Sequence, residues 1–492
     1  MKSWLWGAAA LIIAAAAPAQ AKWHKATSRH FIIYSDSKPD QLRAFATRLE
    51  RFDKAMRVAR SMNDPEVGDG NRLTVLVVRD VGAVQALKKG LRRGAFGFYQ
   101  PRASGSVAVV PQSTGPSALD ADTVFFHEYA HHLMLADIKT PMPSWLVEGF
   151  AEFMSTARVN PDGSVALGLP ANHRAANLLS ARAYQMPIAD LLAAKPARSG
   201  GERASLYARG WLVSHYLTFA PQRGGQLQRY LDEYAKGRPA IEAARTAFGD
   251  LAVLEREVDR YLARQSFPAL TLSASRLPIG PVEVAALGTG GNAAMPLFQR
   301  LQARVGDRKG AEDAIAARKL AAAYPRDPLV MMTLAEAEWV AGDYAAAEAA
   351  ADRAIALDPK SSEALIWKGR AIFSQAEKKL PGATFAKARG WFSRANSLDP
   401  ENPEPLLYFY RGYVAEHGKP SPNAVAALHY AAELAPQDLE LALQSALQHV
   451  RDGAPQKARP ALIRIAQNPH GGERSARAAA LLARLDAGKS TP

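Results

Sequence analysis

The sequence predicts an α+β chain in which a small α/β region leads into a helical region and then into an all-α solenoid. Three observations predict this order. Short apolar runs alternate with amphipathic helical patterns over residues 22–115. Two helical segments within 117–155 then carry closely spaced histidines and glutamates. Beyond residue 290 the chain becomes Ala-rich and repeats a helical pattern, and 492 residues leave room for two or three domains.

The first 21 residues have the composition of a secretory signal peptide. A basic start at Lys2 precedes an apolar stretch over 5–17, and residues 19–21 form an A-x-A cleavage site. We therefore expect signal peptide 1–21 to be removed and an exported chain, periplasmic or secreted, to begin at Lys22. An uncleaved anchor is the alternative, but the stretch is short and Ala-rich for a membrane span, and no later apolar run approaches that length.

Composition narrows the classes of function. The chain has no cysteine, which excludes disulfides, thiolate chemistry and cysteine-based zinc sites. The formal net charge of +14 favours anionic partners, although a plain role in solubility is the simpler explanation. No nucleic-acid reader motif accompanies the charge, so we expect no nucleic-acid partner. The sequence does not indicate an oligomeric state.

The region 22–115 is predicted to be a small α/β subdomain. Strand-like apolar runs alternate with amphipathic helical patterns, and a turn at 103–105 separates two short strands into a β-hairpin. The predicted elements are a strand at 30–35, a helix at 39–62, a strand at 73–78, a helix at 81–90, and hairpin strands at 95–100 and 106–111.

A His-Glu-x-x-His pentad occupies residues 127–131, directly after this hairpin. Ser117 and Asp120 have the spacing of a capping box, so a helix is expected to begin there. Apolar residues continue the helical pattern, and neither Gly nor Pro interrupts it before Pro141. The pentad is therefore predicted to lie within one helix.

On that helix the two histidines are expected to form a pair of metal ligands. His127 and His131 leave the same face one turn apart and can share one Zn²⁺ ion, with bonds of about 2.0–2.1 Å. Glu128 lies beside the first ligand, where it can act on a water molecule without binding the metal. His132 is rotated about 100° from His131 and is expected to pack or to face solvent.

A second helix is predicted after Pro143, with Ser144 as its N-cap. Glu148 and Glu152 then fall four residues apart on one face. Because a catalytic zinc takes three protein ligands and keeps one position open, we expect Glu148 to be the third ligand. Glu152 is placed to accept the other ring N–H of a ligand histidine, which fixes its tautomer. Gly149 is expected to let the two helices approach closely.

HEYAH at 127–131 and WLVEGFAEF at 145–153 resemble the gluzincin branch of the zincin metallopeptidases, the peptidase-MA-like group. The resemblance is specific over 117–155 and loose over 28–265. It implies a zincin-like catalytic domain with one bound Zn²⁺ ion and a carboxylate that serves as general base. The residues that it assigns are the zinc ligands His127, His131 and Glu148, and the base Glu128.

The resemblance also suggests where a peptide would bind. In similar peptidases an edge strand before the metal helix pairs with the extended substrate. The candidates here are Ser106, Val107, Ala108 and Val109. An ordinary interior hairpin fits the same pattern. Zinc peptidases also use a Tyr or His from a later helix to stabilise the oxyanion. Tyr207 and His215 are candidates for that role, and each is equally compatible with a structural position in the core.

The domain boundaries follow from these patterns. The zincin-like domain is expected at 22–265, with its active-site helical subdomain at 116–265. Within it, 159–170 is predicted to form a small hairpin punctuated by Gly and Pro. Residues 266–290 mix Pro, Gly and Ser with short apolar runs, which indicates a linker.

The remaining residues, 291–485, repeat one helical unit. Ala, a large residue, Ala and Pro recur at the same offsets in two copies, and a third copy at 342–359 carries Ala351 where the others have the large residue. This pattern resembles tetratricopeptide repeats, in which small residues lie where paired helices touch. The two matching copies are Ala388, Phe392, Ala395, Pro400 and Ala424, Leu428, Ala431, Pro436. Such a solenoid presents a concave face that binds peptides or partner proteins.

We therefore expect an exported zinc metallopeptidase that hydrolyses peptide bonds through a zinc-activated water, with a repeat domain that docks its substrate or a protein partner. The alternative is a catalytically weak zincin-fold scaffold that acts in envelope assembly through its repeats. Exported metallopeptidases with C-terminal tetratricopeptide repeats, which act in quality control of outer-membrane proteins, have a similar layout. They place the third glutamate in a different signature, so this analogy is architectural only.

Overall fold

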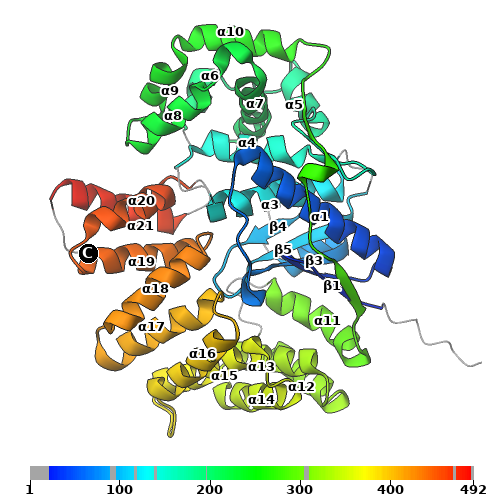
Figure 1. The fold of residues 1–492 in the computed structure, drawn as a ribbon, viewed down its shortest axis with the longest axis vertical. Helices are drawn as coiled ribbons and strands as arrows, with labels where there is room; N and C mark the ends of the chain where they lie inside the picture. Colours follow the sequence, from blue (N-terminus) through cyan, green and yellow to red (C-terminus); the bar gives the residue numbers. More distant parts are fainter. Residues whose placement is uncertain are drawn as a thin grey trace, which may run out of the picture.

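The computed structural model describes residues 22–88, 96–115, 119–137, 141–194, 197–303, 310–468 and 472–488. It is mostly helical, with a β-sheet in its N-terminal part and a C-terminal series of helices that curves around that sheet (Figure 1). The predicted signal peptide at 1–21 lies outside the described residues. No helix in the described part of the chain is long and apolar enough to cross a membrane.

Among the described residues, six strands form a mixed sheet with the order β4-β5-β3-β2-β1-β9. β2, β3 and β5 are parallel, whereas β4 and β1 run antiparallel to their neighbours. The strand bounds are β1 His24–Thr27, β2 Phe31–Ser35, β3 Leu73–Asp80, β4 Phe98–Gln100, β5 Val107–Ser113 and β9 Glu283–Ala286. The predicted strands and hairpin are confirmed, and β1 and β9 were not predicted.

The sheet is covered by helices on both faces because its side chains alternate in direction. Ile33 and Val75 belong to the core shared with α1 and α3, whereas Leu76 and Val109 belong to the core shared with α2 and α11. Consequently α11 belongs to the core of the sheet as well as to the C-terminal series. These helices are α1 Pro39–Arg60, α2 Val81–Leu87, α3 Ala121–Asp137 and α11 Thr289–Gln302.

Helix α3 contains the His-Glu-x-x-His pentad and begins at Ala121. Asp120 caps it by accepting a hydrogen bond from the backbone N–H of Thr123, at 2.6 Å. Ser117, the predicted start of the capping box, lies outside the described residues. Helix α1 packs against α3, since Phe126 stacks on Phe52 of α1 with ring centroids 3.9 Å apart.

Helix α4 packs against α3, and further helices follow α4 in the chain (Figure 1). Ser144 is the first residue of α4 rather than its N-cap, which is Pro143. The close approach predicted for Gly149 occurs with α7 rather than with α3, since a Cβ atom on Gly149 would lie 2.4 Å from the carbonyl oxygen of Gly210. The helices of this part of the chain are α4 Ser144–Ser155, α5 Ala175–Leu179, α6 Ile188–Leu192, α7 Gly200–Phe219, α8 Gln226–Ala235, α9 Ala240–Phe248 and α10 Leu251–Leu262.

The segment 266–290 is not a linker, contrary to the prediction. Within it β9 pairs with β1 and becomes an edge of the six-stranded sheet. β8 adds a third strand to the predicted hairpin at 159–170. Strands of three or four residues bury little apolar area, so backbone pairing with distant segments leaves almost no signal in the sequence. The strands of the second sheet are β6 Arg158–Val159, β7 Val165–Leu167 and β8 Leu270–Leu272.

From α11 onwards the chain forms antiparallel helix pairs that curve below and beside the sheet (Figure 1). The repeated alanines lie where these helices touch, since Ala388, Ala395, Ala424 and Ala431 are all fully buried. This confirms the predicted solenoid. Its further helices are α12 Gly310–Ala323, α13 Pro328–Ala341, α14 Tyr344–Leu357, α15 Ser362–Glu377, α16 Phe385–Leu398, α17 Pro403–His417, α18 Pro422–Leu434, α19 Leu439–Arg451, α20 Pro455–Ala466 and α21 Glu473–Asp486.

Candidate metal centre

Helices α3 and α4 bring three metal-binding side chains together. The Nε2 atoms of His127 and His131 lie 3.2 Å apart. Oε2 of Glu148 lies 3.6 Å from the first of these atoms and 3.5 Å from the second. A tetrahedral zinc with bonds of about 2.0–2.1 Å separates its ligand atoms by about 3.3 Å. The structure therefore brings together the three residues named as ligands in the sequence analysis, at spacings compatible with three corners of a tetrahedral site.

The residues of the candidate metal centre are buried to different degrees. Phe126 and Ala130 are buried in the core between the sheet and the helices, whereas His127, Glu128 and His131 are only partly buried. Glu148, on α4, is buried with 3% of its surface exposed. A catalytic zinc site must be accessible to water and substrate, in contrast to a closed structural site, and partial burial of the histidines is compatible with that need.

The electrostatics of the site favour a cation. Burial lowers the pKa of His127, but the charges of Glu152, Glu148 and Glu128 outweigh burial and raise this pKa to about 9. The hydrogen bond to Glu152 and the surrounding carboxylates therefore favour the protonated form of this imidazole. Two imidazole nitrogens and one carboxylate oxygen are also a mixed donor set that suits zinc.

Glu152 lies directly behind the first histidine, as predicted. Its Oε1 atom is 3.3 Å from Nδ1 of His127. The same carboxylate accepts hydrogen bonds from Nε2 of His173 at 2.7 Å and from Nη2 of Arg174 at 2.5 Å. Burial raises the pKa of Glu152, but hydrogen bonds from His127, His173 and Arg174 outweigh burial and hold the net pKa well below its usual range. Glu152 is therefore an ionised acceptor with 1% of its surface exposed.

His173 and Arg174 were not predicted from the sequence. Both lie in a short 3-10 turn, Asn172–Arg174, that follows β7 and matches no motif. The one signal available was indirect: a carboxylate buried on the inner face of α4 needs a cation nearby. Choosing Arg174 as that cation requires knowing how the turn folds back onto α4.

Tyr207 reaches the site from α7. Its ring stacks on that of His127, with centroids 6.0 Å apart and an interplanar angle of 18°. Burial, followed by the charge of Glu148 and a hydrogen bond to it, raises the pKa of the Tyr207 hydroxyl. The hydroxyl therefore stays protonated and can donate a hydrogen bond. The contact between Gly149 and Gly210 brings α7 close enough for this position.

His215, the other predicted oxyanion donor, lies outside the site. It is fully buried, its Nδ1 atom lies 2.8 Å from the hydroxyl of Tyr261, and its Nε2 atom lies 2.8 Å from the carbonyl oxygen of Gly168. Burial lowers its pKa to about 4. His215 is thus a neutral core residue eight residues beyond Tyr207 on α7, which places it about two turns from the site.

His132 packs against its neighbours, as predicted, and takes no part in the donor triangle. Its ring stacks on Tyr129, with centroids 5.3 Å apart, and its Nδ1 atom lies 2.7 Å from the hydroxyl of Tyr99. Burial lowers its pKa to about 3, so it is neutral. Through this contact strand β4, which contains Tyr99, is joined to the residue that follows the ligand His131.

The predicted substrate strand is an interior strand. β5 pairs with β3 on one side and with β4 on the other, so its backbone is used on both sides along the predicted segment. The side chains of that segment are also buried. The misassigned residues are Ser106, Val107, Ala108 and Val109. The edge of the sheet on this side is β4, and no other described strand pairs with it. Strand order depends on chain crossovers, which the local pattern does not encode.

A second group of potential metal ligands lies on the other side of α3. His30, Glu50 and Asp53 place their donor atoms close together and are buried. However, Arg57 donates from Nε to both oxygens of Asp53 at 2.9 Å, and the Tyr129 hydroxyl donates to the same carboxylate at 2.8 Å. The negative charge of Asp53 is thus compensated by the guanidinium group of Arg57. The group is a hydrogen-bonded anchor for α3.

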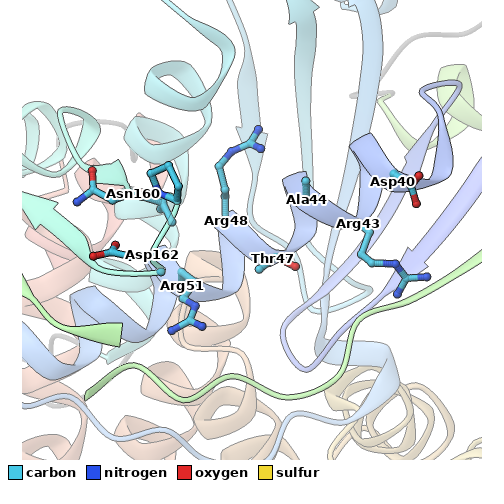
Figure 2. Close-up of a pocket in the computed structure, with 11 residues that line it drawn as sticks. Asp40, Arg43, Ala44, Thr47, Arg48, Arg51, Asn160 and Asp162 are labelled. Carbon is cyan, nitrogen blue, oxygen red and sulfur yellow. The ribbon is translucent and has the colours of Figure 1, made fainter. Parts of the chain in front are cut away.

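A surface cavity of about 590 Å³ lies between α1 and the β6–β7 turn (Figure 2). Three arginines of α1 line it, but their guanidinium groups already have partners. Arg48 forms two hydrogen bonds to Asp122, Arg51 donates to two backbone carbonyls, and Arg43 donates to a third. None of the donor residues on α3 or α4 lines this cavity. It is therefore separate from the candidate metal centre.

Comparisons with known proteins give distant structural likenesses and one family match. The chain resembles the solved structures of a MamA RS-1 double mutant (17% identity, TM-score 0.29, 36% of this chain and 94% of that one) and of MamA from Desulfovibrio magneticus RS-1 (18%, 0.28, 36% and 93%). Yeast Tom70 is similar at 12% identity and a TM-score of 0.26, over 63% of this chain and 70% of its own. These TM-scores are low, so the likenesses support no conclusion about function.

The comparison with curated proteins gives no match. The family model for the tetratricopeptide repeat matches residues 330–371, which begin in α13, include α14 and end in α15. This match includes the repeat copy predicted at 342–359 from the spacing of its alanines. The C-terminal part of the chain therefore contains tetratricopeptide repeats.

Proposed function

We propose that the protein is a zinc-dependent metallopeptidase. The observation that carries this proposal is the triangle of donor atoms from His127, His131 and Glu148, with sides of 3.2, 3.5 and 3.6 Å. Its dimensions fit a tetrahedral ion, its donors are those of hydrolytic zinc sites, and its two histidines are only partly buried. The gluzincin-like signature of α3 and α4 adds to this support.

When bound, zinc supplies the Lewis acidity that activates water and polarises a carbonyl group. The residues of the chain supply the remaining steps. Glu128 follows the first ligand and accepts the proton of the attacking water, then delivers it to the leaving amine. Tyr207 keeps its proton and donates a hydrogen bond to the oxyanion. Glu152 holds Nδ1 of His127, so that Nε2 faces the other donors.

An extended peptide would bind along β4, the free edge nearest to α3. Backbone hydrogen bonds to an edge strand hold a substrate without regard to its side chains. Tyr99 lies in β4 and contacts His132, so the strand has a defined position relative to the metal helix. This assignment replaces the predicted pairing along β5.

Elemental analysis and a peptide-library cleavage assay test the proposal. The wild type is expected to contain one zinc per chain and to cleave peptides. Glu128→Gln is expected to keep the zinc and to lose most of the turnover, because it removes a base but no ligand. His127→Ala is expected to lose both zinc and activity. Equal cleavage by wild type and Glu128→Gln would contradict the mechanism.

A second candidate function is that of a scaffold, and the tetratricopeptide match favours it. Such repeats commonly bind protein partners and carry no chemistry of their own. In this reading the α3–α4 site is a regulatory or vestigial metal site, and the repeats act in assembly. Stoichiometric zinc in a wild-type protein that cleaves no member of the library would favour the scaffold over the peptidase.

A further inference from the structure

The inner side of the repeat solenoid holds a part of the same chain. This part is the hairpin formed by β4, β5 and the turn between them, residues 98–113. The start of the solenoid contacts the hairpin first. Nε2 of Gln100 donates to the carbonyl oxygen of Ala303 at 3.1 Å, and Nη2 of Arg102 donates to that of Gln302 at 2.9 Å. Both acceptors lie at the C-terminal end of α11, where its carbonyls have no helical partner.

A later part of the solenoid holds the same hairpin from another direction. The backbone N–H of Ala103 donates to Oδ2 of Asp438 at 2.8 Å. Gln437, with 2% of its surface exposed, donates from Nε2 to the hydroxyl of Ser106 at 3.5 Å. Both residues lie in the loop between α18 and α19. The hairpin is therefore fixed between two regions of the solenoid that are about 135 residues apart in sequence.

Apolar packing accompanies these hydrogen bonds. Ala103, at the hairpin turn, has 4% of its surface exposed and belongs to a hydrophobic cluster of the solenoid. The cluster otherwise consists of residues from α17, α18 and α19, including Leu407, Tyr410 and Leu441. The turn thus contributes to the core of the repeats, which distinguishes it from a surface loop that only touches them.

The solenoid also holds the end of the metal helix. Nη1 of Arg464, on α20, donates to the carbonyl oxygen of Leu135 at 3.1 Å, and its Nη2 atom donates to that of Pro436 at 3.1 Å. The Leu135 side chain packs against the cluster formed by α19, α20 and α21. A cation at the C-terminus of α3 is favoured by the helix dipole. One guanidinium therefore joins α3 to the loop that holds the hairpin.

These contacts end at the candidate metal centre. Between the hairpin and α3 lies the hydrogen bond that joins Tyr99 in β4 and His132, the residue after His131. The solenoid consequently holds both partners of this bond, β4 through the hairpin turn and α3 through Arg464. A shift of either one relative to the other would move the free edge of β4 with respect to the donor triangle.

We propose that the repeat solenoid is a positioning element of the active site, which holds the substrate-binding strand β4 in register with the metal helix α3. This inference rests on the proposed peptidase function. It also changes the expected role of the repeats, because their inner side near α17–α19 is occupied by the hairpin of the same chain. A partner protein would have to bind elsewhere on the repeats or displace the hairpin.

The substitution Asp438→Asn in the full-length chain tests this role. Oδ1 of Asp438 caps α19 by accepting from the backbone of Glu440 and Leu441, while Oδ2 accepts from Ala103. Asparagine is an equally good N-cap but has a single acceptor oxygen, so the substitution keeps the helix and removes the bond to the hairpin. Asp343→Asn is the matched control, since Asp343 caps α14 by accepting from Ala346 and does not contact the hairpin.

Hydrogen–deuterium exchange measures the position of β4 without any need for activity. In Asp438→Asn, amides of residues 98–107 are expected to exchange about three- to tenfold faster, as the loss of one hydrogen bond implies. The peptide KM is expected to rise several-fold with kcat nearly unchanged, whereas loss of folded protein would lower kcat alone. Asp343→Asn is expected to match the wild type in both measurements.

Arg464→Met provides a second test that keeps the hairpin contacts of Asp438. Faster exchange is expected at the end of α3 and in β4, with Arg459→Met on the same helix as control, because Arg459 pairs with the exposed Asp486. Unchanged exchange in β4 in both Asp438→Asn and Arg464→Met would overturn the positioning role. Failure of the peptidase function would show separately, as wild-type protein without zinc or without cleavage.

Discussion

Oε1 of Glu152 lies 3.3 Å from Nδ1 of His127, so a buried carboxylate determines which ring nitrogen of the first ligand faces the other two donors. The same carboxylate is held by His173 and Arg174 on its outer side. The His127 ring is thus oriented by a series of contacts that begins in the 3-10 turn Asn172–Arg174, which is distant from α3 in the sequence only.

Glu152→Gln is expected to lower the affinity for zinc about 10- to 100-fold, the usual effect of weakening the partner of a ligand histidine. The neutral amide still accepts a hydrogen bond but no longer strengthens the imidazole as a donor. Competition with a chromogenic chelator measures this affinity. Glu242→Gln, on the exposed side of α9, is the control and should match the wild type. Equal affinities for all three proteins would remove Glu152 from the metal centre.

Tyr207→Phe is expected to reduce kcat about 100-fold while the zinc content stays at one per chain, because the substitution removes one donor to the oxyanion and no ligand. Burial and Glu148 raise the pKa of this hydroxyl, so it remains a donor over the whole neutral range. Steady-state kinetics on a cleaved peptide provide the measurement. Tyr184→Phe, on a tyrosine with 48% of its surface exposed, should leave kcat unchanged. A fully active Tyr207→Phe enzyme would exclude the role.

Gly149→Ala is expected to destabilise the protein by about 1–3 kcal/mol, since the new Cβ would meet the backbone of Gly210 at 2.4 Å and the helices α4 and α7 would have to separate. Gly201→Ala is the matched control in α7. Its Cβ would meet nothing closer than 3.7 Å, so the substitution should be neutral or stabilising. Denaturant unfolding compares the two. Equal stability of both variants would contradict the close crossing.

Glu336 on α13 predicts a pH dependence of stability. Burial raises the pKa of Glu336, Arg102 and Arg370 lower it, and the charge of Glu363 raises it. The net pKa is about 7 instead of the usual 4.5. Between these two values the folded chain keeps a proton that the unfolded chain has released. The free energy of unfolding therefore falls as pH rises from about 4.5 to 7, and is level above that window.

Glu336→Gln removes this contribution, so its stability relative to the wild type should rise across that window, by about 1–3 kcal/mol. Unfolding curves at pH 5 and pH 7.5 measure the difference. Glu377→Gln, on an exposed glutamate at the end of α15, should give a difference that does not change with pH. Parallel curves for wild type and Glu336→Gln would mean that Glu336 ionises normally in the folded state.

The donor triangle could be predicted because it depends on local geometry. Helical periodicity alone places His127 and His131 on one face, and the signature of the second helix identifies Glu148. The buried alanines of the repeats were predictable for the same reason. The two histidines and the repeated alanines are placed by the spacing within single helices, whereas Glu148 is identified by the resemblance of its own helix to the gluzincin signature.

The remaining parts of the site depend on contacts between distant segments. Arg174 reaches Glu152 because a 3-10 turn folds over α4, and the edge position of β4 follows from the strand order. The pairing of β9 with β1 joins segments about 260 residues apart through backbone atoms alone. The position of the hairpin within the solenoid arises in the same way, through Gln437 and Asp438. Helical periodicity and short motifs do not predict such contacts.

X-ray absorption at the zinc edge, on the full-length protein loaded with zinc, tests the central claim most directly. The account predicts one zinc per chain with two imidazole nitrogens and a carboxylate oxygen at about 2.0–2.1 Å, and loss of the bound zinc in His127→Ala. A protein that binds no stoichiometric zinc, or a bound zinc whose spectrum shows no imidazole and is unchanged in His127→Ala, would contradict it.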